Sequence, residues 1–322
     1  MSAYLDYYKN KRIAIPGGSG FFGSHIVEHL KKNDIAAAVG SRRSGYDFRD
    51  PADCKRFYEA EKPDIVINCA ANQGGIGYHS GRQAELYLDN TLMGTYLMKA
   101  AQEAGVKKFI NVVAGCAYPG YLEKDELNEE DFYNGNPHDT IFSYGFPRRA
   151  STVFGKALFM QHGFNSIHLI YANMFGPGEH FEPSQSKALA GLMKKFYDAK
   201  KGNASSVEVW GTGKPVRDWL YVKDGVEGLL RAGAVYDSVE PLNIATGVGI
   251  SVADLAHTIR KIVGYSGEVV FNTAKPDGAL KKTFGVSKMK SELNWLPQAS
   301  LADGIRETLE WLDKNYDRVV KI

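Results

Sequence analysis

The feature that most constrains this chain is a cluster of glycines close to its start. A short apolar strand at 13–15 leads into Gly17, Gly20 and Gly23, and a helical segment follows at 25–32. Only glycine permits the tight turn, the close approach of a pyrophosphate and the close helix-on-strand packing that such a unit needs. A glycine-rich turn without a ligand is the alternative, which the flanking strand and helix disfavour. The pattern predicts a dinucleotide-binding turn formed by Gly17, Gly20, Phe21, Phe22 and Gly23.

Length and composition exclude several classes of protein. The chain has 322 residues, which exceeds the size at which single cores stop growing, so we expect two lobes. A net charge of +2 gives no reason to expect nucleic acid or an anionic membrane as partner. Three widely spaced cysteines form neither a disulfide framework nor a zinc pattern, and the histidines lack metal-ligand spacing, so we assign no metal. Without a signal-like start or a membrane-spanning apolar run, we expect a cytoplasmic protein.

Apolar strands and helices alternate through the first half of the chain. Strand-like runs at 35–39, 64–71, 107–114 and 166–172 are separated by helical segments. This alternation predicts an α/β fold with a doubly wound, mostly parallel sheet and helices on both faces. After Gly178 the pattern becomes irregular, so a second, smaller lobe is interleaved with the first.

Two arginines after the second strand bear on the choice of cofactor. In dinucleotide folds, an acidic residue here binds the ribose 2′-hydroxyl, whereas arginine accommodates a 2′-phosphate. The chain has Arg42 and Arg43 and no carboxylate at this point, which favours NADP(H) over NAD(H); the alternative is a solvated basic turn. We expect further cofactor contacts from residues that would meet the adenine, Asp47 and Phe48, and from small residues after the third strand, Ala70 and Ala71.

Two helices carry additional expectations. Pro147 is tolerated only in the first turn of a helix, which places Tyr144 at the start of a helix that runs towards His162. A stripe of apolar residues at helical spacing within 84–104 indicates either core or a dimer face.

Several motifs together carry a family resemblance over nearly the whole chain. They are the three glycines, Gly115-Cys-Ala-Tyr-Pro119, Ser143-Tyr144, Asn173-Met-Phe-Gly-Pro177, Val209-Trp-Gly-Thr-Gly213, Arg217-Asp-Trp-Leu-Tyr-Val-Lys-Asp224 and Lys275-Pro-Asp-Gly278. With these motifs the chain resembles the extended short-chain dehydrogenase/reductases, which are NAD-dependent epimerases and dehydratases, and within them the GDP-fucose synthase family. Members invert C3 and C5 of a GDP-linked 4-keto-6-deoxyhexose and then transfer hydride from NADPH to C4.

The resemblance implies a Rossmann domain and a nucleotide-sugar lobe. We assign residues 1–175 and 217–247 to the dinucleotide-binding domain, and residues 176–216 and 248–322 to the lobe that binds the nucleotide sugar. It also implies a homodimer formed by the helices around 84–104 and 147–162.

The residues for hydride transfer match the family unevenly. Tyr144 falls on the catalytic tyrosine, whose hydroxyl donates a proton or a hydrogen bond to the C4 oxygen. Four residues later the family has a lysine that binds the nicotinamide ribose, and this chain has Arg148, which is not a conservative exchange. The usual serine or threonine of the triad falls on Ala114, which has no hydroxyl. The doubtful step is therefore reduction at C4.

The residues for epimerisation match better. Cys116 falls on the catalytic cysteine, and the family's partner histidine is replaced by Lys187. The related GDP-mannose 3,5-epimerase pairs a cysteine with a lysine, and Cys116 with Lys187 is similar to that arrangement. A proton α to a ketone must leave one face of the ring and return on the other, which requires two flanking groups. Taken separately, Cys116 would be a buried apolar residue and Lys187 a surface lysine.

The resemblance also implies how the nucleotide sugar is held. Trp210, Arg217 and Lys282 fall where the family holds the diphosphate and the base, and Asn173 lines the expected substrate pocket. Arginine binds phosphate through its fork, and an aromatic face stacks on a base. His180 lines the expected pocket and is a further possible contact. Three functions stay open: an epimerase that also reduces C4, an epimerase alone, and a nucleotide-binding protein without catalysis.

Overall fold

A six-stranded parallel sheet forms the centre of the larger lobe. The computed structural model describes residues 3–182, 185–275 and 277–320; residues 183–184 of the expected loop and Pro276 of the last motif lie outside them. The strands run in the order β2, β1, β3, β4, β5, β9, with bounds Ala37–Gly40, Ile13–Pro16, Ile65–Asn68, Lys108–Ala114, Ser166–Tyr171 and Leu242–Ile244. The next two strands in the chain, β2 and β3, pair with opposite edges of β1. This reversal creates a crevice at the carboxyl ends of the strands, where ligands bind in such folds.

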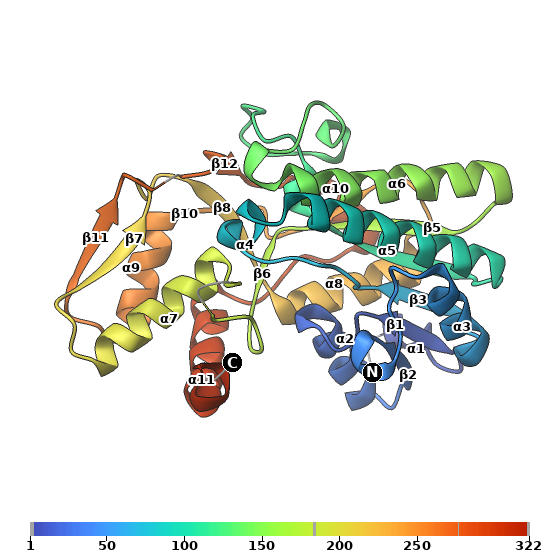
Figure 1. The fold of residues 1–322 in the computed structure, drawn as a ribbon, viewed down its shortest axis with the longest axis horizontal. Coiled ribbons are helices and arrows are strands. Elements are labelled where there is room, and N and C mark those ends of the chain that lie inside the picture. The colour runs from blue at the N-terminus through green and yellow to red at the C-terminus, as the bar shows by residue number, and fades with distance from the viewer. Residues whose placement is uncertain (1–2, 183–184, 276, 321–322) are drawn as a thin grey trace.

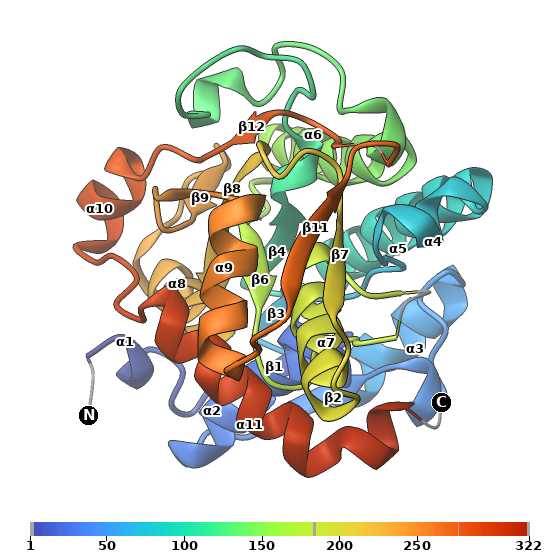
Figure 2. The ribbon, with the colours of Figure 1, turned by 90° about the vertical axis from the view of Figure 1, so that its left-hand side faces the viewer.

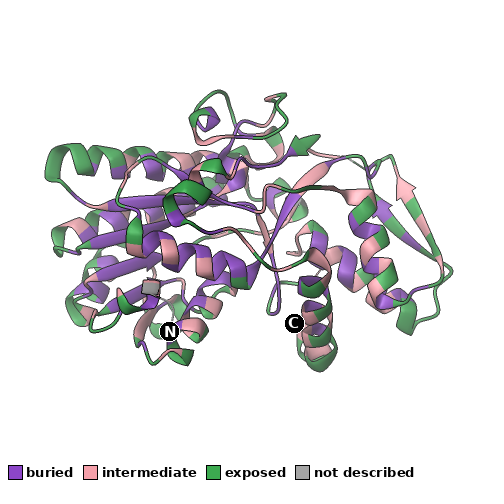
Figure 3. Ribbon diagram, turned by 180° about the vertical axis from the view of Figure 1, so that it is seen from behind, coloured by how far each residue is buried: buried purple, intermediate pink, exposed green. Residues whose placement is uncertain are grey.

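Helices cover both faces of this sheet (Figure 1). One face carries α3 (Pro51–Glu61), α5 (Gln83–Glu103) and α6 (Phe142–His162). The opposite face carries α2 (Phe21–Lys32) and α8 (Val222–Val235), flanked by α1 (Ala3–Asp6) and α10 (Ser287–Leu293). Figure 3 shows that the strands between these layers are buried. The predicted doubly wound α/β fold is confirmed, and none of the described helices has the length and apolar character to span a bilayer.

The smaller lobe combines short sheets with helices that pack on them (Figure 2). In one sheet β8 (Val216–Tyr221) pairs with β10 (Gly249–Ser251), β12 (Lys281–Lys282) and β6 (Asn173–Phe175). In the other, β7 (Ser206–Trp210) pairs with β11 (Glu268–Asn272). The helices are α7 (Ala188–Lys201), α9 (Val252–Val263) and α11 (Leu301–Val320). Residues 217–247 were expected to belong to the dinucleotide-binding domain. Of the strands in this segment, β9 joins the large sheet, whereas β8 joins a small one. The domain limits stay a prediction.

Two helices begin earlier than the sequence indicated. α2 starts at Phe21 rather than His25, so the first turn includes Gly23. The expectation that Pro147 lies in a first turn is wrong, because α6 starts at Phe142 and Pro147 is its sixth residue. A proline there removes only the bond to a carbonyl of the first turn, so the helix can begin upstream of it. Tyr144 nevertheless lies in that first turn, as predicted.

Helix α6 is held close to the sheet by a glycine and a chain of buried polar groups. A Cβ at Gly155 would lie 2.3 Å from His168 Nε2, so no larger residue fits between α6 and β5. The Asn111 amide of β4 donates to Ser151 Oγ of α6 at 2.9 Å and lies 3.2 Å from His168 Nδ1. Burial lowers the pKa of His168 to about 3, so this ring is neutral at ordinary pH. These contacts fix the helix that carries Tyr144 and Arg148.

Replacing Gly155 by alanine tests this close contact. The added methyl would push α6 away from His168, and we expect Gly155→Ala to lower the free energy of unfolding by about 1–3 kcal/mol, as overpacking does. Gly94→Ala in α5 is the matched control, because its Cβ would meet Ser151 Cβ at an ordinary 3.5 Å. Urea denaturation measures both. Equal stability of the two variants would show that α6 does not depend on this contact.

Candidate active site

The glycine turn forms a cradle that fits a pyrophosphate. Gly17 has a φ of +78°, and a Cβ there would lie 2.6 Å from the Ala70 nitrogen. A Cβ on Gly23 would lie 2.3 Å from the Gly17 carbonyl oxygen. Gly20 precedes α2 and offers no side-chain cap, so the first-turn N–H groups stay available to an anion. Phe22 is buried against the Tyr171 ring, while Phe21 is half-buried and faces Lys187.

The two predicted arginines lie at the carboxyl end of β2. Arg42 and Arg43 form the short 3₁₀ helix η1 (Arg42–Ser44), both side chains are exposed, and neither forms an ion pair within the described residues. Nearby, the Asp47 carboxylate accepts from Arg49 Nε at 2.9 Å, and this lowers the pKa of Asp47. The Phe48 side chain, expected to meet the adenine, is buried and packs edge-on against the Phe57 ring, with centroids 5.4 Å apart. The exposed guanidinium groups could meet a 2′-phosphate.

Tyr144 lies in the first turn of α6. Its side chain is buried, and its hydroxyl donates to Gln73 Oε1 at 3.4 Å. The His79 ring packs edge-on against it, with centroids 5.7 Å apart. Burial raises the pKa of Tyr144, and the charge of Arg148, 5.1 Å from the ring centroid, opposes this rise. The hydroxyl is therefore a neutral hydrogen-bond donor at pH 7.

Arg148 is buried, and its guanidinium binds the backbone of the segment after β3, which contacts the glycine turn. Its Nη2 donates to the Ala70 carbonyl at 3.0 Å and to Asn90 Oδ1 at 2.7 Å. The Asn90 amide in turn donates to the Asn72 carbonyl at 2.8 Å. Arg148 Nε is buried without a hydrogen-bond partner in the described part of the chain. The arginine that replaces the expected lysine thus belongs to a hydrogen-bonded cluster with Asn90, which the sequence analysis missed.

The residues at the ends of β4 and β3 that face this region, Ala114 and Ala71, lack a hydroxyl group. Ala114 ends β4 with a half-buried methyl group, and exposed Ala71 follows β3 directly after Ala70. The Ser143 hydroxyl of α6 donates to Gln83 Oε1 of α5, so it is already bound elsewhere. Ser143 is therefore not a free substitute for the missing serine or threonine at Ala114.

Cys116 lies in the short 3₁₀ helix η2 (Gly115–Ala117), directly after β4. It is a half-buried free thiol. Burial raises its pKa, and positive charges oppose the rise in the order Lys282, Arg148, Lys187. Lys187 precedes α7, and its Nζ lies 3.7 Å from the carboxylate of buried Glu179. The Lys187 charge is the smallest of these three effects on the thiol, and the ion-pair partner of Lys187 is Glu179, which the sequence analysis did not single out.

Of the four predicted substrate residues, three lie in the sheet around β8 and Trp210 lies in the other small sheet. Trp210 ends β7 and is 55% exposed, with Lys195 Nζ and Lys275 Nζ at 5.3 and 5.1 Å from its ring centre. Half-buried Asn173 donates to the Asp218 carbonyl at 3.2 Å. Arg217 and Lys282 are register partners on β8 and β12. His180 is exposed.

In the last of the predicted motifs, the Asp277 side chain stabilises a neighbouring turn. The Asp277 carboxylate accepts from the Thr212 backbone N–H at 2.7 Å and from its hydroxyl at 2.8 Å. Gly211 has a φ of +83°, and a Cβ there would lie 2.1 Å from Asp277 Oδ1. Asp277 therefore fixes the turn that follows Trp210.

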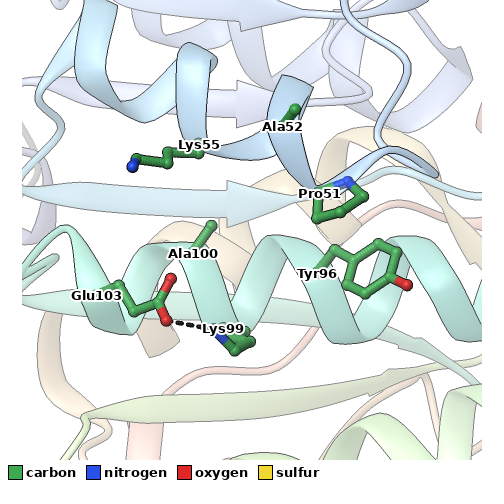
Figure 4. Close-up of a pocket in the computed structure, with 7 residues that line it drawn as sticks. All are labelled: Pro51, Ala52, Lys55, Tyr96, Lys99, Ala100 and Glu103. Carbon is green, nitrogen blue, oxygen red and sulfur yellow. Dashed lines mark hydrogen bonds and ion pairs between the residues drawn. The ribbon is translucent and has the colours of Figure 1, made fainter.

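A shallow pocket on the outer surface lies away from all of these residues. It is formed between α3 and α5, with Pro51 and Lys55 on one helix and Tyr96 and Lys99 on the other (Figure 4). Lys99 is paired with Glu103 there. No predicted site residue lines this pocket, and the described residues contain no cluster of His, Cys, Asp and Glu side chains suited to a metal ion.

Comparison with known proteins places this arrangement in a family. Residues 13–245 match the NAD dependent epimerase/dehydratase family. GDP-L-fucose synthase 1 of Arabidopsis thaliana is 32% identical over 95% of this chain and 94% of its own length. The chain belongs to the NAD dependent epimerase/dehydratase family. The GDP-L-fucose synthase of Escherichia coli K12 is similarly related, at 30% identity over 96% of this chain and 98% of its own.

Solved structures of epimerase/dehydratase family proteins have the same fold. A GDP-L-fucose synthetase from Naegleria fowleri bound to NADP has a TM-score of 0.86 and 30% identity, covering 96% of this chain and 94% of its own. A GDP-6-OMe-4-keto-L-xylo-heptose reductase from C. jejuni has a TM-score of 0.90 and 26% identity, covering 95% and 98%. The resemblance inferred from the motifs is confirmed.

A double-mutant cycle tests the anchoring of Arg148. We expect Asn90→Leu to lower the free energy of unfolding by about 1.5–3 kcal/mol through the lost hydrogen bond to a charged group. In an Arg148→Met background the same change should cost less, since the guanidinium is absent. The other bonds of Asn90 are common to both backgrounds, so urea denaturation of the four proteins isolates the pair. Additive losses would show that Asn90 does not hold Arg148.

Proposed function

We propose that this chain is an NADP(H)-dependent epimerase/reductase that acts on a GDP-linked 4-keto sugar. The observation that carries the proposal is the position of Arg148. It is bonded to the Ala70 backbone beside the glycine cradle, lies against the Tyr144 ring and acts electrostatically on Cys116. One residue thus links the cofactor turn, the tyrosine and the thiol. The names of the relatives, which include GDP-L-fucose synthases and a GDP-keto-heptose reductase, support the substrate class.

The glycine cradle and the exposed arginines are the parts that would hold the cofactor. Gly17, Gly20 and Gly23 leave room for the pyrophosphate, and Arg42 and Arg43 would meet the 2′-phosphate. When bound, NADPH supplies the hydride for C4. A solved relative with NADP bound supports this choice of cofactor.

Cys116 and Lys187 are the proposed pair for proton transfer. A 4-keto group acidifies the protons at C3 and C5, and inversion requires removal from one face and return to the other. In this proposal the Cys116 thiolate and the Lys187 ammonium serve the two faces, while the Tyr144 hydroxyl donates to the C4 oxygen and stabilises the enolate. Asn173, Trp210, Arg217 and Lys282 would hold the rest of the GDP sugar.

A second candidate function is epimerisation without net reduction. Ala114 and Arg148 favour it, because both depart from the residues that normally surround the catalytic tyrosine. The loss of one oxyanion donor typically costs about 100- to 1000-fold in rate. A catalytically inactive nucleotide-binding protein is the third possibility and predicts no turnover at all.

The proposed assembly is a homodimer through α5 and α6. Their outer surfaces expose apolar side chains, among them Leu88 at 55% and Met160 at 78%. Burying such side chains against a second copy would stabilise a dimer. Three free cysteines fit a reducing compartment, and we propose the cytoplasm.

Isotope exchange tests the role of Cys116. In deuterated buffer with GDP-4-keto-6-deoxymannose, we expect deuterium to enter C3 or C5, and Cys116→Ser to suppress this exchange without altering NADPH binding. Mass spectrometry follows the sugar, and cofactor fluorescence follows binding. Cys54→Ala in α3 is the control and should exchange normally. Undiminished exchange in Cys116→Ser would exclude this thiol, and no exchange or NADPH oxidation by the unaltered protein would contradict the proposed function.

Restoring the family residues tests the weak reduction step. We expect Ala114→Ser together with Arg148→Lys to raise the rate of NADPH oxidation with the same substrate, because an oxyanion donor and a compact cation return beside Tyr144. The deuterium exchange rate serves as the internal reference. An unchanged ratio of NADPH oxidation to exchange would show that these two residues do not limit hydride transfer.

A further inference from the structure

The Tyr144 hydroxyl has a polar partner that no sequence motif predicted. It donates to Gln73 Oε1 at 3.4 Å, and Gln73 lies in the segment that joins β3 to α4 (Ile76–Ser80). Catalytic hydrogen bonds are often this long without a ligand and shorten when the substrate binds. A glutamine side chain therefore contacts the very tyrosine whose usual serine or threonine companion is missing at Ala114.

The segment that carries Gln73 is fixed by the residue before it. The Asn72 backbone N–H donates to Asn90 Oδ1 at 3.1 Å, and the Asn90 amide donates back to the Asn72 carbonyl at 2.8 Å. Asn90 Oδ1 also accepts from Arg148 Nη2 at 2.7 Å. One amide of α5 thus holds both the segment of Gln73 and the helix of Tyr144, so their relative position does not depend on a mobile side chain.

The Gln73 amide is open to a ligand, whereas the other donors close to Tyr144 are not. Gln73 is exposed, and its Nε2 donates to no acceptor in the described part of the chain. Arg148 is 4% exposed, with its Nη2 already bonded, and the Ser143 hydroxyl donates to a side chain of α5. A carboxamide has its acceptor and its two N–H donors on one planar group. An oxygen that binds the Tyr144 hydroxyl can therefore accept from the adjacent Nε2.

We propose that Gln73 is a catalytic residue that supplies the donor Ala114 lacks, its side-chain amide donating to the C4 oxygen of the keto sugar beside the Tyr144 hydroxyl. The inference rests on the proposed function and deepens it. When the Cys116 thiolate takes the proton next to the ketone, the C–H electron pair becomes the C=C bond of the enolate and the carbonyl π pair moves to the C4 oxygen. Gln73 keeps both of its N–H hydrogens and stabilises that developing charge.

The deuterium exchange described above measures this effect. Gln73→Leu removes the amide at an exposed position with little change in size. We expect exchange into C3 or C5 to slow by about 100-fold, the typical cost of one oxyanion donor. Affinity for GDP-mannose, measured by calorimetry, should change little, because this ligand has no ketone and never develops the charge. Gln298→Leu is the matched control: it is exposed, bonds the Leu296 carbonyl of its own loop at 2.7 Å, and should exchange normally.

A hydroxyl at position 114 provides a rescue that a structural role would not show. Ala114→Ser returns a donor to the C4 oxygen from the end of β4. In that background Gln73→Leu should slow exchange by less than about tenfold, because a second donor serves the same oxygen. Gln73→Glu keeps an acceptor for the Tyr144 hydroxyl but has no donor. It should lose exchange as Gln73→Leu does, and it replaces that variant if leucine prevents folding.

The outcomes separate this inference from the function on which it rests. Exchange by Gln73→Leu at the rate of Gln298→Leu overturns the inference, and so does an equal loss with alanine and with serine at position 114. A parallel loss of GDP-mannose affinity overturns it too, because Gln73 would then bind the ground state. In each of these cases the proposed function stands. If the unaltered protein shows neither exchange nor NADPH oxidation, the function fails and the inference falls with it.

Discussion

The close contact between the Gly17 backbone and the chain after β3 determines how everything else in the site is placed. Any side chain at Gly17 would collide with Ala70, so the two backbones meet at the switch point of the sheet. The Ala70 carbonyl is then available to Arg148, and through Arg148 the start of α6 is tied to the same edge. Tyr144 lies near Cys116 because the start of α6 packs on the turn after β4, where a Cβ on Gly145 would lie 3.1 Å from the Cys116 carbonyl oxygen.

Local patterns were sufficient to predict the fold class and the family. The strand–glycine–helix unit, the alternation of elements and the motif at Ser143-Tyr144 each depend on residues close in sequence, and the fold class and family were confirmed. Helix starts were less accurate, as α2 and Pro147 show, because a helix can begin upstream of the residue that a local rule selects. The roles assigned to Cys116, Lys187 and the substrate residues stay predictions.

What the sequence could not predict depends on contacts between distant segments. Asn90 and Gln73 have no motif, and only the packing of α5 and α6 against the chain after β3 brings them to Arg148 and Tyr144. From the sequence, Glu179 is a carboxylate in a loop, and only the structure shows that it lies beside Lys187. The burial of Lys282 opposite Arg217 likewise depends on the pairing of β12 with β8, which joins segments distant in sequence. No sequence pattern identifies Asn90, because its side chain meets Arg148 only in the folded chain.

The pairing of β6 with β8 has a consequence for how such proteins diversify. The chain leaves the large sheet after β5, enters the small one, returns through α8 and β9, and leaves again at β10. Neither lobe is a continuous stretch, so no single recombination event could exchange one substrate lobe for another. A chain segment that carries the whole smaller lobe therefore also carries α8 and β9 of the larger one, so neither lobe can be replaced without touching the other.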